Sequence, residues 1–133
     1  MDNNIVTEQL PDLTDAEPIE IAKMLVQVLD RKKGRDIKLL RIADHTIIAD
    51  YFVICGGTSS TNVKALAGEA EYKLTQCGVE PLRMDGYSEG QWIAVDFGSV
   101  IVHIMNRENR DFYKLEKLWS EAESIDVSDL ILP

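Results

Sequence analysis

The sequence is poor in cysteine and has no hydrophobic run long enough to cross a membrane. Its 133 residues include two cysteines, Cys55 and Cys77, with neither the number of a disulfide framework nor the spacing of a metal site. A membrane-spanning helix needs about 20 consecutive apolar residues. The N-terminus also lacks the basic start and apolar stretch of a signal peptide. We therefore expect a cytoplasmic protein with reduced cysteines and no membrane contact.

Basic residues are missing from both ends of the chain. Residues 1–17 carry five acidic residues and residues 120–133 carry four, with no Lys or Arg in either segment. The whole chain has 23 acidic and 14 basic residues, for a net charge of −9, so the middle is formally neutral. A hydrophobic content of 45% is enough for a core. We interpret residues 1–17 as a mobile acidic leader, 18–120 as the folded domain and 121–133 as an acidic tail.

Hydrophobic spacing predicts helices and strands in alternation. Helices are expected from Pro18 to a stop at Gly34, from about Val63 to a stop at Gly78, and over residues 107–119 with Phe112, Leu115, Leu118 and Trp119 facing inward. Strands are expected at residues 36–42, 51–55, 81–84, 91–97 and 100–105. The fold class is therefore α/β, with a single mixed β-sheet of about five strands packed with helices.

The most informative segment is the hairpin around Gly98 and Ser99. If these are the two turn residues, alternation places one fully apolar set on one face: Ile93, Val95, Phe97, Val100, Val102 and Ile104. Helices are expected to pack there. The other face, which we call the mixed face, carries Trp92, Ala94, Asp96, Ile101, His103 and Met105. Its composition is typical of a docking surface. Two alternatives stay open: a helix covers this face too, or a three-residue turn exchanges the two faces.

Residues capable of catalysis do not form a recognisable set. The Gly56-Gly57-Thr58-Ser59-Ser60 junction could hold a phosphate, but it matches neither nucleotide-binding fingerprint, so capping of the following helix is favoured. No two carboxylates share a strand face to hold divalent cations. His45 and His103 lie 58 positions apart, and Cys55 sits in an apolar run that disfavours a thiolate. We expect no catalytic residues, metal or cofactor, with a nucleotide- or phosphate-binding transferase as the alternative.

A basic stretch over residues 31–41 is the one feature that suggests nucleic acid. It carries six basic residues and one acidic residue. The stacking aromatics of a nucleic-acid-binding sheet are absent beside it, and the overall acidity opposes binding to a duplex. We therefore expect no direct DNA binding. Acidity does not oppose a basic protein partner.

Several blocks of the sequence together carry a family resemblance. They are Asp50-Tyr51-Phe52-Val53-Ile54, Gly57-Thr58-Ser59-Ser60 with Val63-Lys64-Ala65-Leu66-Ala67, Trp92 to Gly98, Val100 to Met105, and Phe112 to Trp119. In this order they resemble the ribosomal silencing factor family, also called the Iojap family. The similarity covers roughly residues 18–120. Two small departures are Ile48-Ala49, where the family usually has an apolar residue and Thr, and Ser99, where it often has Asp.

The resemblance implies a non-enzymatic translation factor with a nucleotidyltransferase-like fold that lacks the metal-binding carboxylates. Such factors bind the large ribosomal subunit through ribosomal protein fourteen, block subunit joining and repress translation under nutrient limitation; organellar relatives act in ribosome biogenesis. The family's partner surface lies around the Trp-containing hairpin, here Trp92 and Asp96. The residues expected to bind the partner are Trp92, Asp96, Ile101, His103, Met105, Asp85, Tyr87 and Glu89. A homodimer formed through the mixed face stays open.

Overall fold

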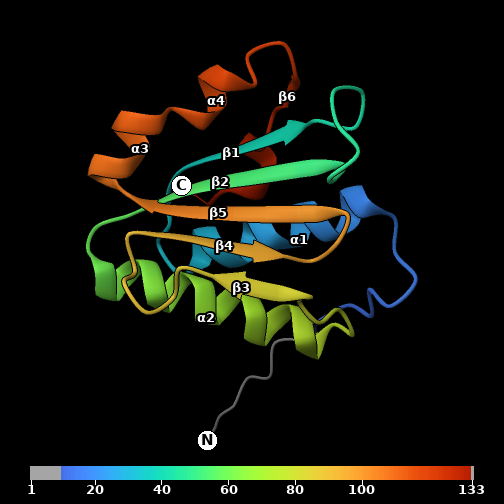
Figure 1. Ribbon diagram of the computed structural model, residues 1–133. Helices are drawn as coiled ribbons and strands as arrows, with labels where there is room; N and C mark the ends of the chain where they lie inside the picture. Colours follow the sequence, from blue (N-terminus) through green and yellow to red (C-terminus); the bar gives the residue numbers. More distant parts are fainter. Residues whose placement is uncertain (1–9, 133) are drawn as a thin grey trace, which may run out of the picture.

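The computed structural model describes residues 10–132, which form one mixed sheet with helices on both faces (Figure 1). The helices are α1 (Pro18–Arg31), α2 (Ser60–Gln76), α3 (Arg107–Tyr113) and α4 (Leu115–Leu118), with a short 3-10 helix, η1 (Ser128–Leu130). The strands are β1 (Arg35–Arg41), β2 (Tyr51–Gly57), β3 (Arg83–Asp85), β4 (Trp92–Asp96), β5 (Val100–Asn106) and β6 (Glu123–Ile125). Within residues 10–132, none of the helices has the length and apolarity to cross a membrane.

The sheet has the strand order β3-β4-β5-β2-β1-β6. Its central pair, β2 and β5, is parallel, and every other neighbouring pair is antiparallel. Helices α1 and α2 cover one face and bury the larger core, while Leu115 of α4 packs into a smaller core on the opposite face. Strand β2 is buried from Phe52 to Gly57, which explains its uninterrupted apolar sequence. The predicted single mixed α/β sheet is thus confirmed, with six strands.

The hairpin of β4 and β5 has the predicted two-residue turn. Trp92 pairs with Met105 and Asp96 with Ile101, and Phe97 N donates to Val100 O at 2.9 Å. Gly98 has a φ of +94°, which favours glycine there. The predicted apolar face is buried against α1 and α2 at all six positions: Ile93, Val95, Phe97, Val100, Val102 and Ile104. The face assignment is confirmed, and the exchanged alternative is wrong.

The junction between β2 and α2 is a helix cap. Ser59 Oγ accepts a hydrogen bond from Asn62 N at 3.1 Å, and Thr58 N donates to Asn62 Oδ1 at 2.8 Å. Gly57 is required by packing, because a Cβ there would lie 2.6 Å from Val63 Cγ2. The capping role favoured from the sequence is confirmed for Ser59.

The predicted helix over residues 107–119 is interrupted. Lys114 adopts a left-handed backbone with φ of +48°, and this residue separates α3 from α4. Leu115 is buried and Trp119 is half-buried, as expected. Phe112 and Leu118 were expected to face inward but are 79% and 72% exposed. The change in chain direction at Lys114 alters the helical face that each residue occupies, so the inward prediction was wrong for these two.

The predicted domain boundaries were also too narrow. Leu13, in the expected leader, is buried, and its N–H donates to Cys77 O at 2.8 Å. In the expected tail, β6 pairs with β1, and Ile125, Val127 and Ile131 pack against the larger core. Residues 10–17 and 121–132 therefore belong to the folded unit. The first nine residues of the expected leader lie outside the described part of the chain.

Candidate functional site

The mixed face is covered over part of its width. Met105 lies in the smaller core, with Phe52, Ile54, Leu40 and Leu115. At the edge of that core, Trp92, Ile101 and Trp119 keep part of their surface in contact with solvent. The alternative that a helix also covers the mixed face is therefore correct near β2 and the end of β5. Along β4, by contrast, the mixed-face side chains stay half-exposed.

A chain of aromatic contacts fixes Trp92 in one position. Trp92 Nε1 donates to His103 Nδ1 at 3.0 Å. The Trp92 ring lies 4.9 Å from that of Tyr113, and the His103 ring lies 4.6 Å from that of Phe52, which in turn contacts Trp119 at 5.4 Å. A side chain held in this way loses little conformational freedom when it binds a partner.

His103 is a structural acceptor in this cluster. Burial lowers the pKa of its imidazole to about 4, because desolvation disfavours the charged form. The neutral ring accepts from Trp92 at Nδ1, which places its proton on Nε2. Nε2 is buried without a hydrogen-bond partner among the described residues. His103 therefore serves to orient Trp92, and little of its own surface is available to a partner.

A small hollow of about 370 Å³ adjoins Trp92 and carries polar and acidic groups. It is lined by Gly86, Ser88, Glu89, Gln91, Trp92, Asn109 and Tyr113. Tyr87 is 48% exposed nearby in the chain, and Lys64 Nζ lies 5.8 Å from the centre of its ring. The exposed Asp85, on the neighbouring strand β3, lies 3.4 Å from Arg83 Nε. In the hollow, the rings of Trp92 and Tyr113 and the carboxylate of Glu89 form a surface that can accommodate a cationic side chain.

Two predicted site residues differ from expectation in their exposure or contacts. Met105 has no exposed surface, because the segment around Leu115 closes over this end of β5. Its assignment to the contact surface is therefore corrected: it supports that surface from within the core. Asp96 is half-buried, and its Oδ1 accepts from Gly98 N at 2.8 Å, so the carboxylate also fixes the hairpin turn.

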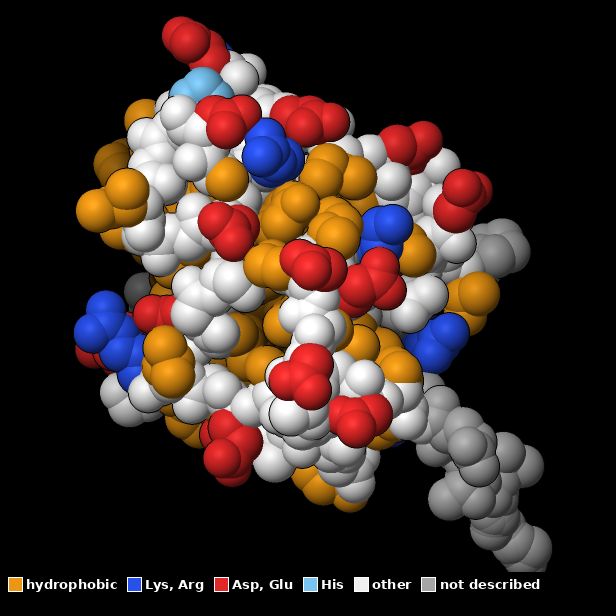
Figure 2. All heavy atoms as spheres, turned by 90° about the vertical axis from the view of Figure 1, so that its right-hand side faces the viewer, with side chains coloured by type: hydrophobic (Ala, Val, Ile, Leu, Met, Phe, Trp, Pro, Cys, Tyr) orange, Lys and Arg blue, Asp and Glu red, His pale blue; other side chains and the backbone are white. Residues whose placement is uncertain are grey.

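Two exposed apolar side chains that the sequence pattern did not single out lie in the loop between β1 and β2. They are Ile47 and Ile48. This loop lies against the hairpin turn, where Asp50 N donates to Ser99 O at 2.8 Å. Figure 2 shows this end of the molecule, with acidic side chains around a band of hydrophobic ones. Two adjacent isoleucines in a loop are the sequence feature that could have indicated this exposed apolar surface. Tyr113 was missed because no pattern predicts the break at Lys114.

Two candidate reactive side chains, Cys55 and Ser59, are buried or engaged in the fold. Among residues 10–132, no group of three or more His, Cys, Asp or Glu side chains is placed to hold a metal ion. Burial raises the pKa of the Cys55 thiol to about 12, so it remains protonated and is a poor nucleophile. Ser59 is engaged as a helix cap.

Comparison with known proteins gives consistent matches over most of the chain. Residues 15–132 match the family model described as ribosomal silencing factor during starvation. The ribosomal silencing factor of Halalkalibacterium halodurans is 34% identical over 112 residues, covering 84% of this chain and 96% of that protein. A Mus musculus protein named mitochondrial assembly of ribosomal large subunit protein 1 is 37% identical over 73% of this chain and 44% of its own. A crystal structure from Chromobacterium violaceum has a TM-score of 0.76 at 36% identity, covering 78% of this chain and 87% of that one.

Proposed function

This chain belongs to the ribosomal silencing factor family, and from that premise we propose that it binds the large ribosomal subunit through ribosomal protein fourteen. The bound factor occupies space that the small subunit must enter, so it prevents subunit joining and represses translation when nutrients are limiting. This steric mechanism needs no covalent chemistry. We place its action in the cytoplasm, with a role in ribosome biogenesis as a related function.

The observation that carries the proposal is the fixed, half-exposed Trp92 in an acidic setting. Tryptophan at the centre of an interface is the most frequent kind of binding hot spot. The aromatic cluster and the His103 hydrogen bond hold the ring ready to bind. Glu89 lines the adjoining hollow and complements a basic ribosomal protein. We therefore propose a contact surface formed by Trp92, Asp96, Ile101, Asp85, Tyr87, Glu89 and Tyr113, with His103 orienting Trp92 beneath it.

The test is binding of purified large subunits by Trp92→Ala. We expect a loss of at least about 2 kcal/mol, roughly thirtyfold in affinity, because the anchor of the surface is removed. Tyr72→Ala is the matched control: Tyr72 is also an exposed aromatic residue, on α2 at the opposite face of the sheet. Far-ultraviolet circular dichroism verifies that both variants are folded. Normal binding by a folded Trp92→Ala variant would refute this surface.

A second assay tests the mechanism as well as the contact. Large subunits are incubated with the protein, small subunits are added, and joined ribosomes are separated on a sucrose gradient. We expect the wild-type protein to lower the joined fraction and Trp92→Ala to lower it far less. If the protein binds the large subunit without lowering the joined fraction, the proposed partner would stand but the steric block would be refuted.

A further inference from the structure

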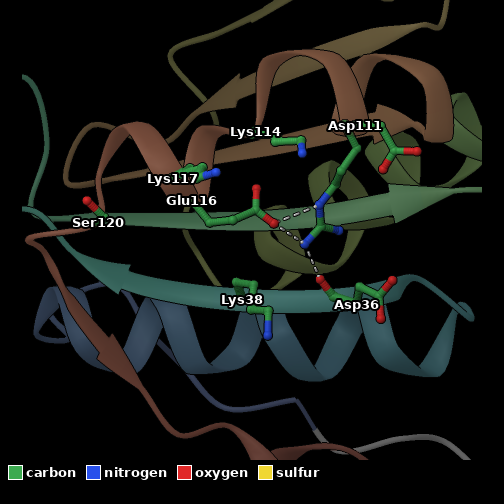
Figure 3. A pocket seen from close by; sticks show the side chains of 8 residues that line it. Asp36, Lys38, Asp111, Lys114, Glu116, Lys117 and Ser120 are labelled. Atoms are coloured by element: carbon green, nitrogen blue, oxygen red, sulfur yellow. Dashed lines mark hydrogen bonds and ion pairs between the residues drawn. The ribbon is translucent and has the colours of Figure 1, made fainter.

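Basic side chains from distant parts of the sequence face one another across a groove between β1 and the α3–α4 segment. Figure 3 shows Lys38 on β1, with Lys114 and Lys117 on the other side. The cavity has a volume of about 590 Å³. It is lined by Asp36, Lys38, Arg110, Asp111, Lys114, Glu116, Lys117 and Ser120. The left-handed turn at Lys114 gives α3 and α4 different directions along this groove.

The groove continues toward the end of β2 in a second cavity of about 510 Å³. Arg35 and Arg107 line this part beside the backbone of Gly56, Gly57 and Thr58. Asp36, Arg110 and Asp111 line both cavities, so the two are continuous. We call the combined surface the basic groove, with the five basic residues Arg35, Lys38, Arg107, Lys114 and Lys117.

Arg110 fixes the shape of the basic groove. Its side chain is only 11% exposed and forms an ion pair with Glu116, with 3.1 Å between Nη2 and Oε2. The guanidinium also donates to the carbonyl oxygens of Arg35 at 3.2 Å and Asp36 at 2.6 Å. These bonds tie α3 and α4 to β1, and the Arg110 and Glu116 charges offset one another. The five basic residues then face two acidic ones, Asp36 and Asp111, which leaves a local charge of about +3.

This local charge is opposite in sign to that of the molecule, which has a net charge of −9. A polyanion is repelled by the chain as a whole, but at physiological salt distant charges are screened beyond about 8 Å. Binding of a polyanion is therefore favoured in the basic groove. Its lining includes no aromatic side chain among the described residues, so bases have no stacking partner. The surface suits phosphates of the nucleic-acid backbone.

We propose that the basic groove binds the phosphate backbone of ribosomal RNA while the Trp92 surface binds the protein partner. The inference rests on the proposed function, because ribosomal RNA supplies the polyanion at the docking site. Interactions with phosphate contribute affinity and orientation without reading sequence. They also make binding to the subunit depend on salt, since each phosphate neutralised releases counterions.

The test uses charge reversal at two exposed residues of the groove, Lys38→Glu with Lys117→Glu. The matched control reverses two exposed lysines of the α1 region outside the groove, Lys23→Glu with Lys32→Glu. Both variants change the net charge by the same amount. Affinity for purified large subunits is measured by pelleting at salt concentrations from about 50 to 200 mM, the range over which binding to phosphates weakens strongly. Binding to isolated ribosomal protein fourteen is measured in parallel.

We expect the groove variant to bind the subunit about tenfold more weakly or worse. Its salt dependence should be about 1.5 smaller in logarithmic slope, because each phosphate that the protein no longer neutralises lowers the slope by roughly 0.7 to 0.9. Its binding to isolated ribosomal protein fourteen should equal that of the wild type.

Equal affinities and slopes for the groove and control variants would overturn the inference. An equal reduction in affinity for isolated protein fourteen would instead make the groove a protein-binding surface and overturn it as well. If wild-type protein fails to bind subunits at all, the proposed function itself fails.

Discussion

Because the part-buried His103 is held neutral in the folded protein, we predict that stability falls in mildly acidic solution. Its pKa in the folded protein is about 4, against about 6.5 when unfolded. Because the folded value is the lower one, the neutral ring contributes stability that is fully present above pH 6.5 and is lost as the pH falls toward 4. The two values give a loss of about 2 kcal/mol between pH 7.5 and pH 5, and about 3 kcal/mol below pH 4.

His103→Gln separates this contribution from the titration of the other groups. Glutamine can still accept from Trp92 Nε1, but it does not titrate. Urea unfolding of both proteins, followed by tryptophan fluorescence, gives the free energy of unfolding from pH 7.5 to pH 4.5. We expect the wild type to lose about 2 kcal/mol more than His103→Gln between pH 7.5 and pH 5. Parallel pH profiles for the two proteins would refute the argument that His103 must stay neutral to fold.

Three further predictions concern stability and are measured by thermal or urea unfolding. Leu13→Ala should lower the free energy of unfolding by about 2 kcal/mol because it leaves a cavity, whereas Leu82→Ala, at a 73% exposed position, should have little effect. Ser59→Ala should cost roughly 0.5–2 kcal/mol by removing the cap of α2; an unchanged midpoint would show that Asn62 alone suffices. Arg110→Met should cost about 3 kcal/mol, because it leaves the partly buried Glu116 carboxylate without its cation, and it should make α3 and α4 more accessible to proteases.

The hairpin could be predicted from the sequence because the residues that determine it are close together along the chain. Buried and less buried side chains alternate strictly from Ile93 to Phe97 and from Val100 to Ile104, and a two-residue turn joins the two runs. Only one pairing register places the buried side chains of both strands on the same face. The cap at Ser59 is equally local. In each case the residues that determine the structure are neighbours along the chain, so no tertiary information is needed.

The remaining features depend on tertiary contacts. The left-handed backbone at Lys114 has no signal in its residue type, and it decides which side chains of α3 and α4 are exposed. Strand β6 has only three residues and exists because β1 presents an edge to it. In the site, alternation placed Met105 on the correct face but could not show that Leu115 covers it. The basic groove joins Lys38 to Lys117, and only the fold brings these positions together.

The parallel pairing of β2 with β5 has a consequence for synthesis of the protein. Tyr51 of β2 pairs with Val100 of β5, 49 positions later in the chain, so the centre of the sheet closes late and over a long loop. Until β5 leaves the ribosomal exit tunnel, the apolar strand β2 has β1 as its only neighbour and exposes its other edge. The nascent chain is therefore most exposed to aggregation and chaperone binding during this interval. Phe52 lies in β2 and Trp92 in β4, so the proposed contact surface forms only when nearly the whole domain has been made.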